Sequence, residues 1–142
     1  MRSPLRLLFA STALVLSACG DKTASGDIAR VATAGSAAAV PLTGRIIEVS
    51  MQTNDKGNYF EPANIVAQAG DVIRFKLVQG VHNVNFLPDS NPGHASLPTA
   101  TAFAQLPGQA IDVPLTFGTG KFFYQCDPHA MLGMVGRVEI AP

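Results

Sequence analysis

Apolar residues recur at every second position in short runs of this chain, and this spacing limits the possible fold more than any other feature. In one run Ile73, Phe75 and Leu77 alternate with two basic residues. The same alternation recurs in residues 46–51, 111–117 and 137–140. A period of two places successive side chains on opposite faces of a strand, and no window shows a long helical period. The pattern therefore predicts a chain built from strands.

Turn-forming residues separate these runs. Glycine, proline, asparagine and aspartate gather at residues 54–57, 69–71, 89–93, 106–108 and 118–120. Seven or so short strands with one apolar face each are typical of an antiparallel all-β fold, either a sandwich or a barrel. Because proline cannot donate to a sheet ladder, the strand that contains Pro114 is expected at a sheet edge. Residues 87–110 are predicted to be an irregular insert with room for a short helical turn.

Residues 1–18 are predicted to be a signal peptide. Two arginines precede an apolar run over residues 7–16 that is too short to span a bilayer, and small residues follow it. The sequence LSAC at residues 16–19 resembles the lipobox of bacterial lipoproteins, in which the cysteine is acylated and becomes the first residue of the mature chain. We therefore expect export, with Cys19 lipidated on the periplasmic side of a bacterial membrane. A plain signal peptide with an incidental cysteine is the alternative.

Residues 19–41 are rich in alanine, glycine, serine and threonine, and they are predicted to form a lipid-anchored flexible linker. A short helix through the alanines is the alternative. A coil of ~20 residues has a typical end-to-end distance of roughly 25 Å. The folded domain, predicted to cover residues 42–142, could then swing about its anchor and approach membrane-bound partners.

Export changes what the charges and the cysteines imply. The chain holds ten basic and ten acidic residues, and loss of the two signal arginines would leave a net charge of about minus two. This balance does not favour nucleic acid as a partner.

Two cysteines in an exported protein would ordinarily form a disulfide, but a lipidated Cys19 would leave Cys126 as an unpaired thiol. A bound metal would protect such a thiol from oxidation.

Three residues with metal-binding side chains, Cys126, His129 and Met134, lie close together near the end of the chain. Alternation along the preceding strand turns Cys126 inward, and the loop after it is long enough to aim all three side chains at one point. His82, in a strand-like segment, is a better candidate for the fourth ligand than His94 in the proline-rich insert. Two imidazoles, one thiolate and a weak thioether suit a mononuclear blue copper centre, which can serve Cu(I) and Cu(II) with little rearrangement.

The spacing Cys-x-x-His-x-x-x-x-Met, with His-Asn-Val upstream, resembles the cupredoxins, and most closely their plastocyanin and pseudoazurin branch. Further similarity lies in residues 60–73, 124–129 and 133–136, so that the resemblance covers essentially the whole domain. It implies a cupredoxin-like Greek-key sandwich or barrel of about eight strands, with His82 on an inner strand. It also implies one copper ion, with His82, Cys126 and His129 as equatorial ligands and Met134 as the axial ligand.

Three neighbours of these residues are expected to support the site. Asn83 is placed to hydrogen-bond across to the loop of the other ligands, and Pro128 removes a backbone donor and stiffens that loop. Asp127 is expected to serve loop structure rather than acid catalysis. Gln125 stands where plastocyanins carry an exposed tyrosine, and no acidic cluster surrounds it. We therefore do not assign the redox partners of plastocyanins to this chain.

The loop holds two thioethers, and Met131 competes with Met134 for the axial position. The glycines on either side of Met134 and Val135 match the family context and favour Met134. Met131 is assigned with Ala130 and Leu132 to an apolar docking rim. His94 is expected to be a surface residue.

Together these features predict a one-electron carrier that shuttles between membrane-associated or periplasmic redox proteins, such as c-type cytochromes or membrane oxidoreductase complexes. It is expected to act as a monomer, not as an enzyme, and without a small-molecule substrate. Delivery or storage of copper for a cuproenzyme is the alternative, but the sequence has no Met-rich or His-rich flank to support it. A thiol enzyme based on Cys126 and His129 would lack an oxyanion hole. Three histidines are too few for a copper oxidase or nitrite reductase.

Overall fold

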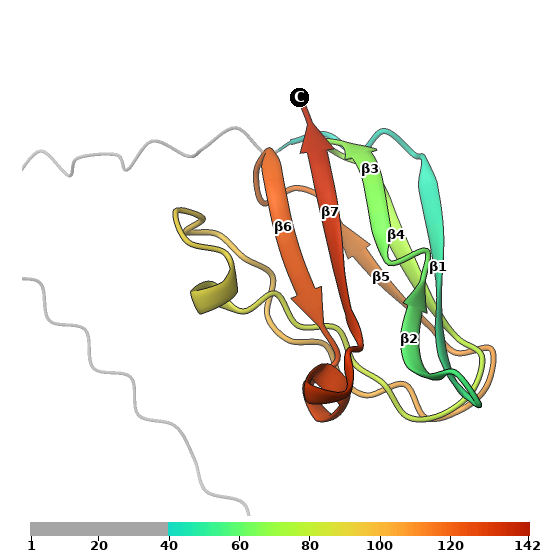
Figure 1. Cartoon of the computed structure of the whole chain (residues 1–142). Coiled ribbons are helices and arrows are strands. Elements are labelled where there is room, and N and C mark those ends of the chain that lie inside the picture. Colours follow the sequence, from blue (N-terminus) through green and yellow to red (C-terminus); the bar gives the residue numbers. More distant parts are fainter. Residues whose placement is uncertain (1–39) are drawn as a thin grey trace, which may run out of the picture. The chain divides into compact units, whose positions relative to one another are not determined.

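The computed structural model describes residues 40–142, which form two β-sheets packed face to face and two short 3₁₀ helices (Figure 1). The predicted signal peptide, Cys19 and almost all of the predicted linker lie outside the described residues. Within the described part, no helix is long and apolar enough to cross a membrane. The prediction of an all-β fold is confirmed.

One sheet has four strands in the order β2-β1-β4-β5, and the other has three in the order β3-β7-β6. The strands are β1 (Ile46–Asn54), β2 (Gly57–Glu61), β3 (Asn64–Gln68), β4 (Val72–Leu77), β5 (Ala110–Pro114), β6 (Gly120–Gln125) and β7 (Val135–Ala141). The pairs β1–β4 and β3–β7 are parallel, whereas the other pairs are antiparallel. The sheets are thus mixed rather than purely antiparallel, because the chain crosses between them after β2, β3 and β5, as in Greek-key connections.

The segment that carries His82 is extended, but it is not a regular strand. It contacts its neighbours through isolated bridges, of which one joins His82 to Ala104 and another joins Asn85 to Gln125. Of the roughly eight strands expected, seven are regular. This bridged segment takes the place at which the resemblance implied an inner strand.

The residues that the alternation placed inward form the core between the two sheets. Ile73 and Phe75 are fully buried. Phe75, Phe60 and Tyr124 meet edge to face, with ring centroids 5.0, 5.3 and 5.7 Å apart. Strand β5, which contains Pro114, lies at the edge of its sheet, as predicted. The aromatic cluster holds β6 in place, and β6 leads directly into the candidate site.

The irregular insert before β5 contains one short 3₁₀ helix, η1 (Pro88–Ser90), which packs near β6. The buried side chain of Asn91 accepts from the N–H of Phe123 (2.7 Å) and donates to its carbonyl oxygen (2.9 Å). These two bonds satisfy the backbone of Phe123 at the outer edge of β6 and help to protect that edge from pairing with another chain. His94, expected at the surface, is instead half-buried because its ring packs on Phe122, with centroids 4.1 Å apart.

Candidate metal centre

The loop after β6 is closed by hydrogen bonds of its own backbone. Cys126 follows the strand, the 3₁₀ helix η2 (Asp127–Leu132) comes next, and Met134 leads into β7. The N–H of Cys126 donates to the carbonyl oxygen of Met134 (3.1 Å), and the N–H of Met134 donates to that of His129 (3.1 Å). The three residues that the sequence singled out in this loop are thereby held close together.

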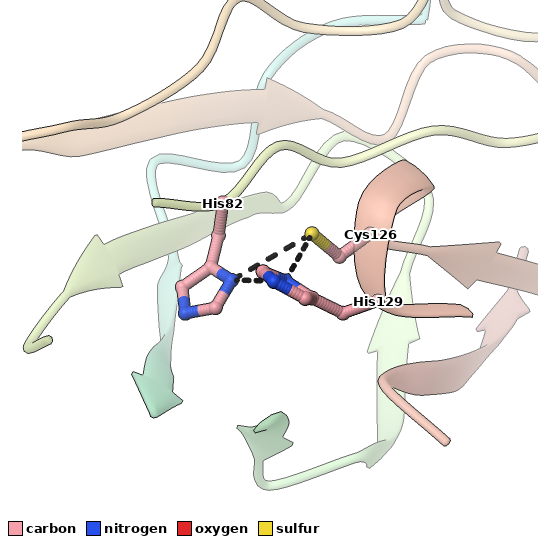
Figure 2. Close-up of side chains that lie close together, drawn as sticks. All are labelled: His82, Cys126 and His129. Carbon is pink, nitrogen blue, oxygen red and sulfur yellow. Dashed lines mark hydrogen bonds between the residues drawn. The ribbon is translucent and has the colours of Figure 1, made fainter. Parts of the chain in front are cut away.

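Two histidine ring nitrogens and the thiol of Cys126 form a small triangle (Figure 2). Nδ1 of His82 lies 3.1 Å from Nδ1 of His129, and Cys126 Sγ lies 3.6 Å and 3.4 Å from these two atoms, respectively. The point equidistant from all three atoms is about 2.0 Å from each, close to the usual metal bonds of histidine and cysteine, which are about 2.0–2.3 Å long. The spacing therefore fits one metal ion bound by all three side chains.

Hydrogen bonds on the far side of the His82 ring turn Nδ1 toward this triangle. Nε2 lies 3.0 Å from the carbonyl oxygen of Gln79, which can only accept, so Nε2 carries the ring proton. The hydroxyl oxygen of Thr53 lies 3.1 Å from the same nitrogen, and Thr53 donates its own proton to Asn58. Burial lowers the pKa of His82. The hydrogen bond to the Gln79 carbonyl opposes this effect, and the nearby His129 ring adds to it. The ring is therefore neutral, with the lone pair on Nδ1 that a metal ligand requires.

We expect Gly80→Ala to displace His82 and weaken metal binding. Gly80 has a φ of +98°, and a Cβ added there would lie 2.7 Å from His82 Nε2 and closer still to Thr53 Oγ1. Because the ring would have to move, metal affinity measured by titration should fall by about 10- to 100-fold. Gly108→Ala is the matched control, since Gly108 has a φ of +86° but open space around its Cβ position. Equal affinities of the two variants would contradict this role of Gly80.

Cys126 is fully buried, and burial raises the pKa of its thiol, while the backbone N–H groups of Asn83 and His129 act in the opposite direction. Within the described residues it is a free cysteine. A metal cation held at this position would bind the thiolate of Cys126 in place of the thiol proton. Two neutral imidazoles and one thiolate are the trigonal donor set of blue copper sites. The residues present therefore fit copper.

Asn83 joins the His82 segment to the ligand loop. It accepts from the N–H of Asp127 (2.8 Å) and donates to Asp127 Oδ2 (2.7 Å). Two further donors were not predicted from the sequence: Asn85 and Gln125 both donate to Asp127 Oδ1, at 2.9 and 3.2 Å. Burial opposes ionisation of Asp127, but the three amide hydrogen bonds outweigh it and lower the pKa of the carboxyl group. The sequence did hold a signal for Asn85: its i, i+2 spacing from Asn83 places both side chains on the same face.

The two thioethers lie in different environments. Met134 is fully buried, whereas Met131 is 97% exposed. The residues assigned to the docking rim share η2 with His129 and Pro128, and among them Leu132 is 68% exposed and Ala130 is half-buried. His129 itself is half-buried. Burial therefore distinguishes the two thioethers of the loop: Met134 lies inside the protein, whereas Met131 faces solvent.

Residues 47–141 match the protein family described as copper binding proteins, plastocyanin/azurin family. The chain is 32% identical over 145 residues to the chloroplastic plastocyanin of Hordeum vulgare, a match that covers 97% of this chain and 88% of that protein. It is 33% identical over 106 residues to the plastocyanin of Prochlorothrix hollandica, which covers 72% of this chain and 78% of that protein.

Solved structures show the same fold. Pseudoazurin from Methylobacterium extorquens AM1 superposes with a TM-score of 0.51 at 27% identity, covering 68% of this chain and 75% of that one. Oxidised plastocyanin from Dryopteris crassirhizoma superposes with a TM-score of 0.54 at 22% identity, covering 66% of this chain and 99% of that one. The family match spans well over half of the chain and includes every residue of the donor triangle. The chain therefore belongs to the plastocyanin/azurin family of copper-binding proteins.

Proposed function

We propose that this protein carries one electron at a time between redox proteins, using a single copper ion held by His82, Cys126, His129 and Met134. The proposal rests on the triangle of two imidazole nitrogens and one thiol, in a chain of a copper-binding family. Copper supplies a one-electron couple between Cu(I) and Cu(II) at such a site. Plastocyanin-like cupredoxins are electron carriers rather than enzymes, and we propose no small-molecule substrate and no nucleic acid partner.

The residues around the site hold its ligands in one arrangement. The hydrogen bonds of Nε2 fix the ring of His82, and backbone bonds fix His129 and Met134 relative to Cys126. Both Cys126 and Met134 are fully buried, which keeps water away from their sulfur atoms. A polar site organised in advance reorganises little when charge changes. The arrangement thus supports fast gain and loss of one electron.

The half-buried His129 and the apolar rim around it are the proposed route for electrons. Met131 and Leu132 present exposed apolar side chains in the last turn of η2. A small apolar surface suits brief, weak docking better than a permanent complex. We propose c-type cytochromes or membrane oxidoreductase complexes as partners, with the protein acting as a monomer.

Met131→Lys should slow electron exchange without altering the copper site. A charge on the docking rim opposes apolar contact, so we expect about a tenfold lower second-order rate with a reduced c-type cytochrome, measured by stopped flow. Thr116→Lys is the matched control, because it adds the same charge at the end of the sandwich opposite η2. Thr116 follows Leu115, whose N–H donates to the backbone carbonyl oxygen of Asp71 at that end. Equal rates for both variants would argue against this route. Transfer of copper itself to an acceptor, without electron exchange, would favour the delivery alternative.

Export and anchoring are part of the same proposal: Cys19 carries lipid, and the domain lies on the periplasmic side of a bacterial membrane. The described chain enters the sandwich at the end opposite η2, where β1 begins (Figure 1). There the N–H of Thr43 donates to the carbonyl oxygen of Gly70 (2.9 Å). A tether attached at this end would leave the edge with His129 free to meet a partner.

Cys19→Ser should release the protein from the membrane fraction, because the thiol that would carry the lipid is gone. The measurement is the share of copper-bound protein in the soluble and membrane fractions, with the unchanged chain as the control. Continued membrane retention of the variant would contradict lipidation, and it would leave the copper assignment unaffected.

A further inference from the structure

Asp127 places a carboxylate beside the copper ligands, between Cys126 and Pro128. Its Oδ2 accepts from Asn83 (2.7 Å), and its Oδ1 accepts from Asn85 (2.9 Å) and Gln125 (3.2 Å). Its own N–H donates to Asn83 (2.8 Å), so the residue is held from the backbone as well as from the side chain. The carboxylate therefore occupies one fixed position next to the metal site.

All three side-chain donors to Asp127 are neutral amides. The ion pairs of the described residues join Arg45 to Asp71, Arg74 to Asp112 and Lys121 to Glu139, and none of them includes Asp127. Amide hydrogen bonds stabilise a carboxylate but leave its net charge in place. One uncompensated negative charge thus lies at a residue that directly follows the cysteine ligand.

This charge acts differently on the two states of the couple. When a redox partner gives one electron to the copper, the total charge of the centre falls by one. A nearby negative charge attracts the more positive, oxidised state more strongly, and the attraction grows as distance and effective dielectric constant fall. We propose that Asp127 holds the reduction potential of the centre low, with Asn83, Asn85 and Gln125 as positioning residues for its charge. This inference rests on the proposed function and adds the residue that tunes it.

Asp127→Asn removes the charge and keeps the shape of the side chain. In the copper-loaded full-length protein, the ratio of reduced to oxidised copper at a fixed ambient potential should rise by about tenfold, which is about 59 mV for one electron. The readouts are a redox titration and the blue absorption of the oxidised form. Gln125→Lys is the second variant, because it places a cation against Asp127 without touching the Asn83 contacts, and it should shift the ratio in the same direction.

Glu139→Gln is the matched control. It makes the same change of charge at Glu139, which pairs with Lys121 at the far end of β6. Its ratio should stay at the wild-type value, since charges separated by more than about 10 Å are largely screened at ordinary salt.

The inference is overturned if Asp127→Asn and Gln125→Lys both stay blue with ratios within about twofold of wild type. It is also overturned if Glu139→Gln shifts the ratio as much as they do. If Asp127→Asn fails to fold or to bind copper, Gln125→Lys alone decides. Failure of the proposed function would look different, because the wild-type protein itself would then lack a blue, reversibly reduced centre.

Discussion

Cys126→Ala is expected to abolish the blue absorption of the copper-loaded protein completely. The thiol of Cys126 lies 3.6 Å from Nδ1 of His82 and 3.4 Å from Nδ1 of His129, and Cys19 is the only other cysteine of the chain. Blue copper centres depend on a thiolate ligand. Copper affinity should fall too, by more than about 100-fold, because losing a ligand costs at least as much as losing one of its outer partners.

An absorption titration with Cu(II) measures both effects of Cys126→Ala. Met131→Ala is the matched control, because it also removes a sulfur atom, but from a side chain that is 97% exposed. This control should keep both the colour and the affinity. A blue Cys126→Ala protein, or a colourless Met131→Ala protein, would show that the copper ligands have been assigned wrongly.

Asp71→Asn should lower the free energy of unfolding by about 2–4 kcal/mol at pH 7. The Asp71 side chain is fully buried, and its carboxylate accepts from the Thr43 hydroxyl (2.6 Å), the Gln68 N–H (2.8 Å) and Arg45 Nε (2.9 Å). A neutral amide cannot accept from all of these donors, and it leaves Arg45 without its counter-charge. The contacts also tie the entry of the chain to the turn between β3 and β4, so their loss loosens one end of the sandwich.

Asp112→Asn is the control for this stability prediction. Arg74 donates to both carboxylate oxygens of Asp112 (2.8 and 2.7 Å), but this pair is partly exposed. Pairs of that kind contribute about 0–1 kcal/mol, so Asp112→Asn should cost little in urea unfolding. Equal losses in the two variants would contradict a special role for the buried carboxylate.

The contribution of Asp71 to the free energy of unfolding should also depend on pH. Hydrogen bonding from Arg45 is the main cause that holds the pKa of Asp71 well below its usual range; Thr43 and Gln68 add to it, and burial opposes it. The stabilisation is therefore complete above the pKa of the unfolded chain, about 3.9, and is lost as the pH falls from there toward the folded-state pKa. The difference between wild type and Asp71→Asn in urea unfolding should narrow from pH 7 to pH 3. A constant difference would contradict this assignment.

Local spacing in the sequence was enough to predict the strands and three of the four proposed ligands. The alternation at Ile73, Phe75 and Leu77 reports directly which side of a strand is buried, since it depends only on neighbours along the chain. The short loop of Cys126, His129 and Met134 is likewise local, so its spacing already limited where the three side chains could meet. His82 was preferred to His94 because it lies in a strand-like segment with an asparagine beside it, whereas His94 lies in the proline-rich insert.

Contacts between residues far apart in the sequence could not be predicted in this way. The parallel pairing of β1 with β4 depends on how the sheets assemble, and no turn signal reports it. Thr53 reaches His82 across 29 positions, and Asn91 reaches Phe123 across 32, although neither polar residue stands out in the sequence. Asn85 lies 42 positions from Asp127, so its shared face with Asn83 hinted at a role, but the folded chain was needed to identify the carboxylate that it contacts.

The most direct test of the account is the absorption and electron spin resonance spectrum of the copper-loaded protein. If His82, Cys126, His129 and Met134 hold the copper as proposed, the protein should have an intense blue colour that reductant bleaches and oxidant restores. The spin resonance signal should be that of a single blue copper centre in the oxidised form. A colourless or non-blue copper form of the folded protein would contradict the account.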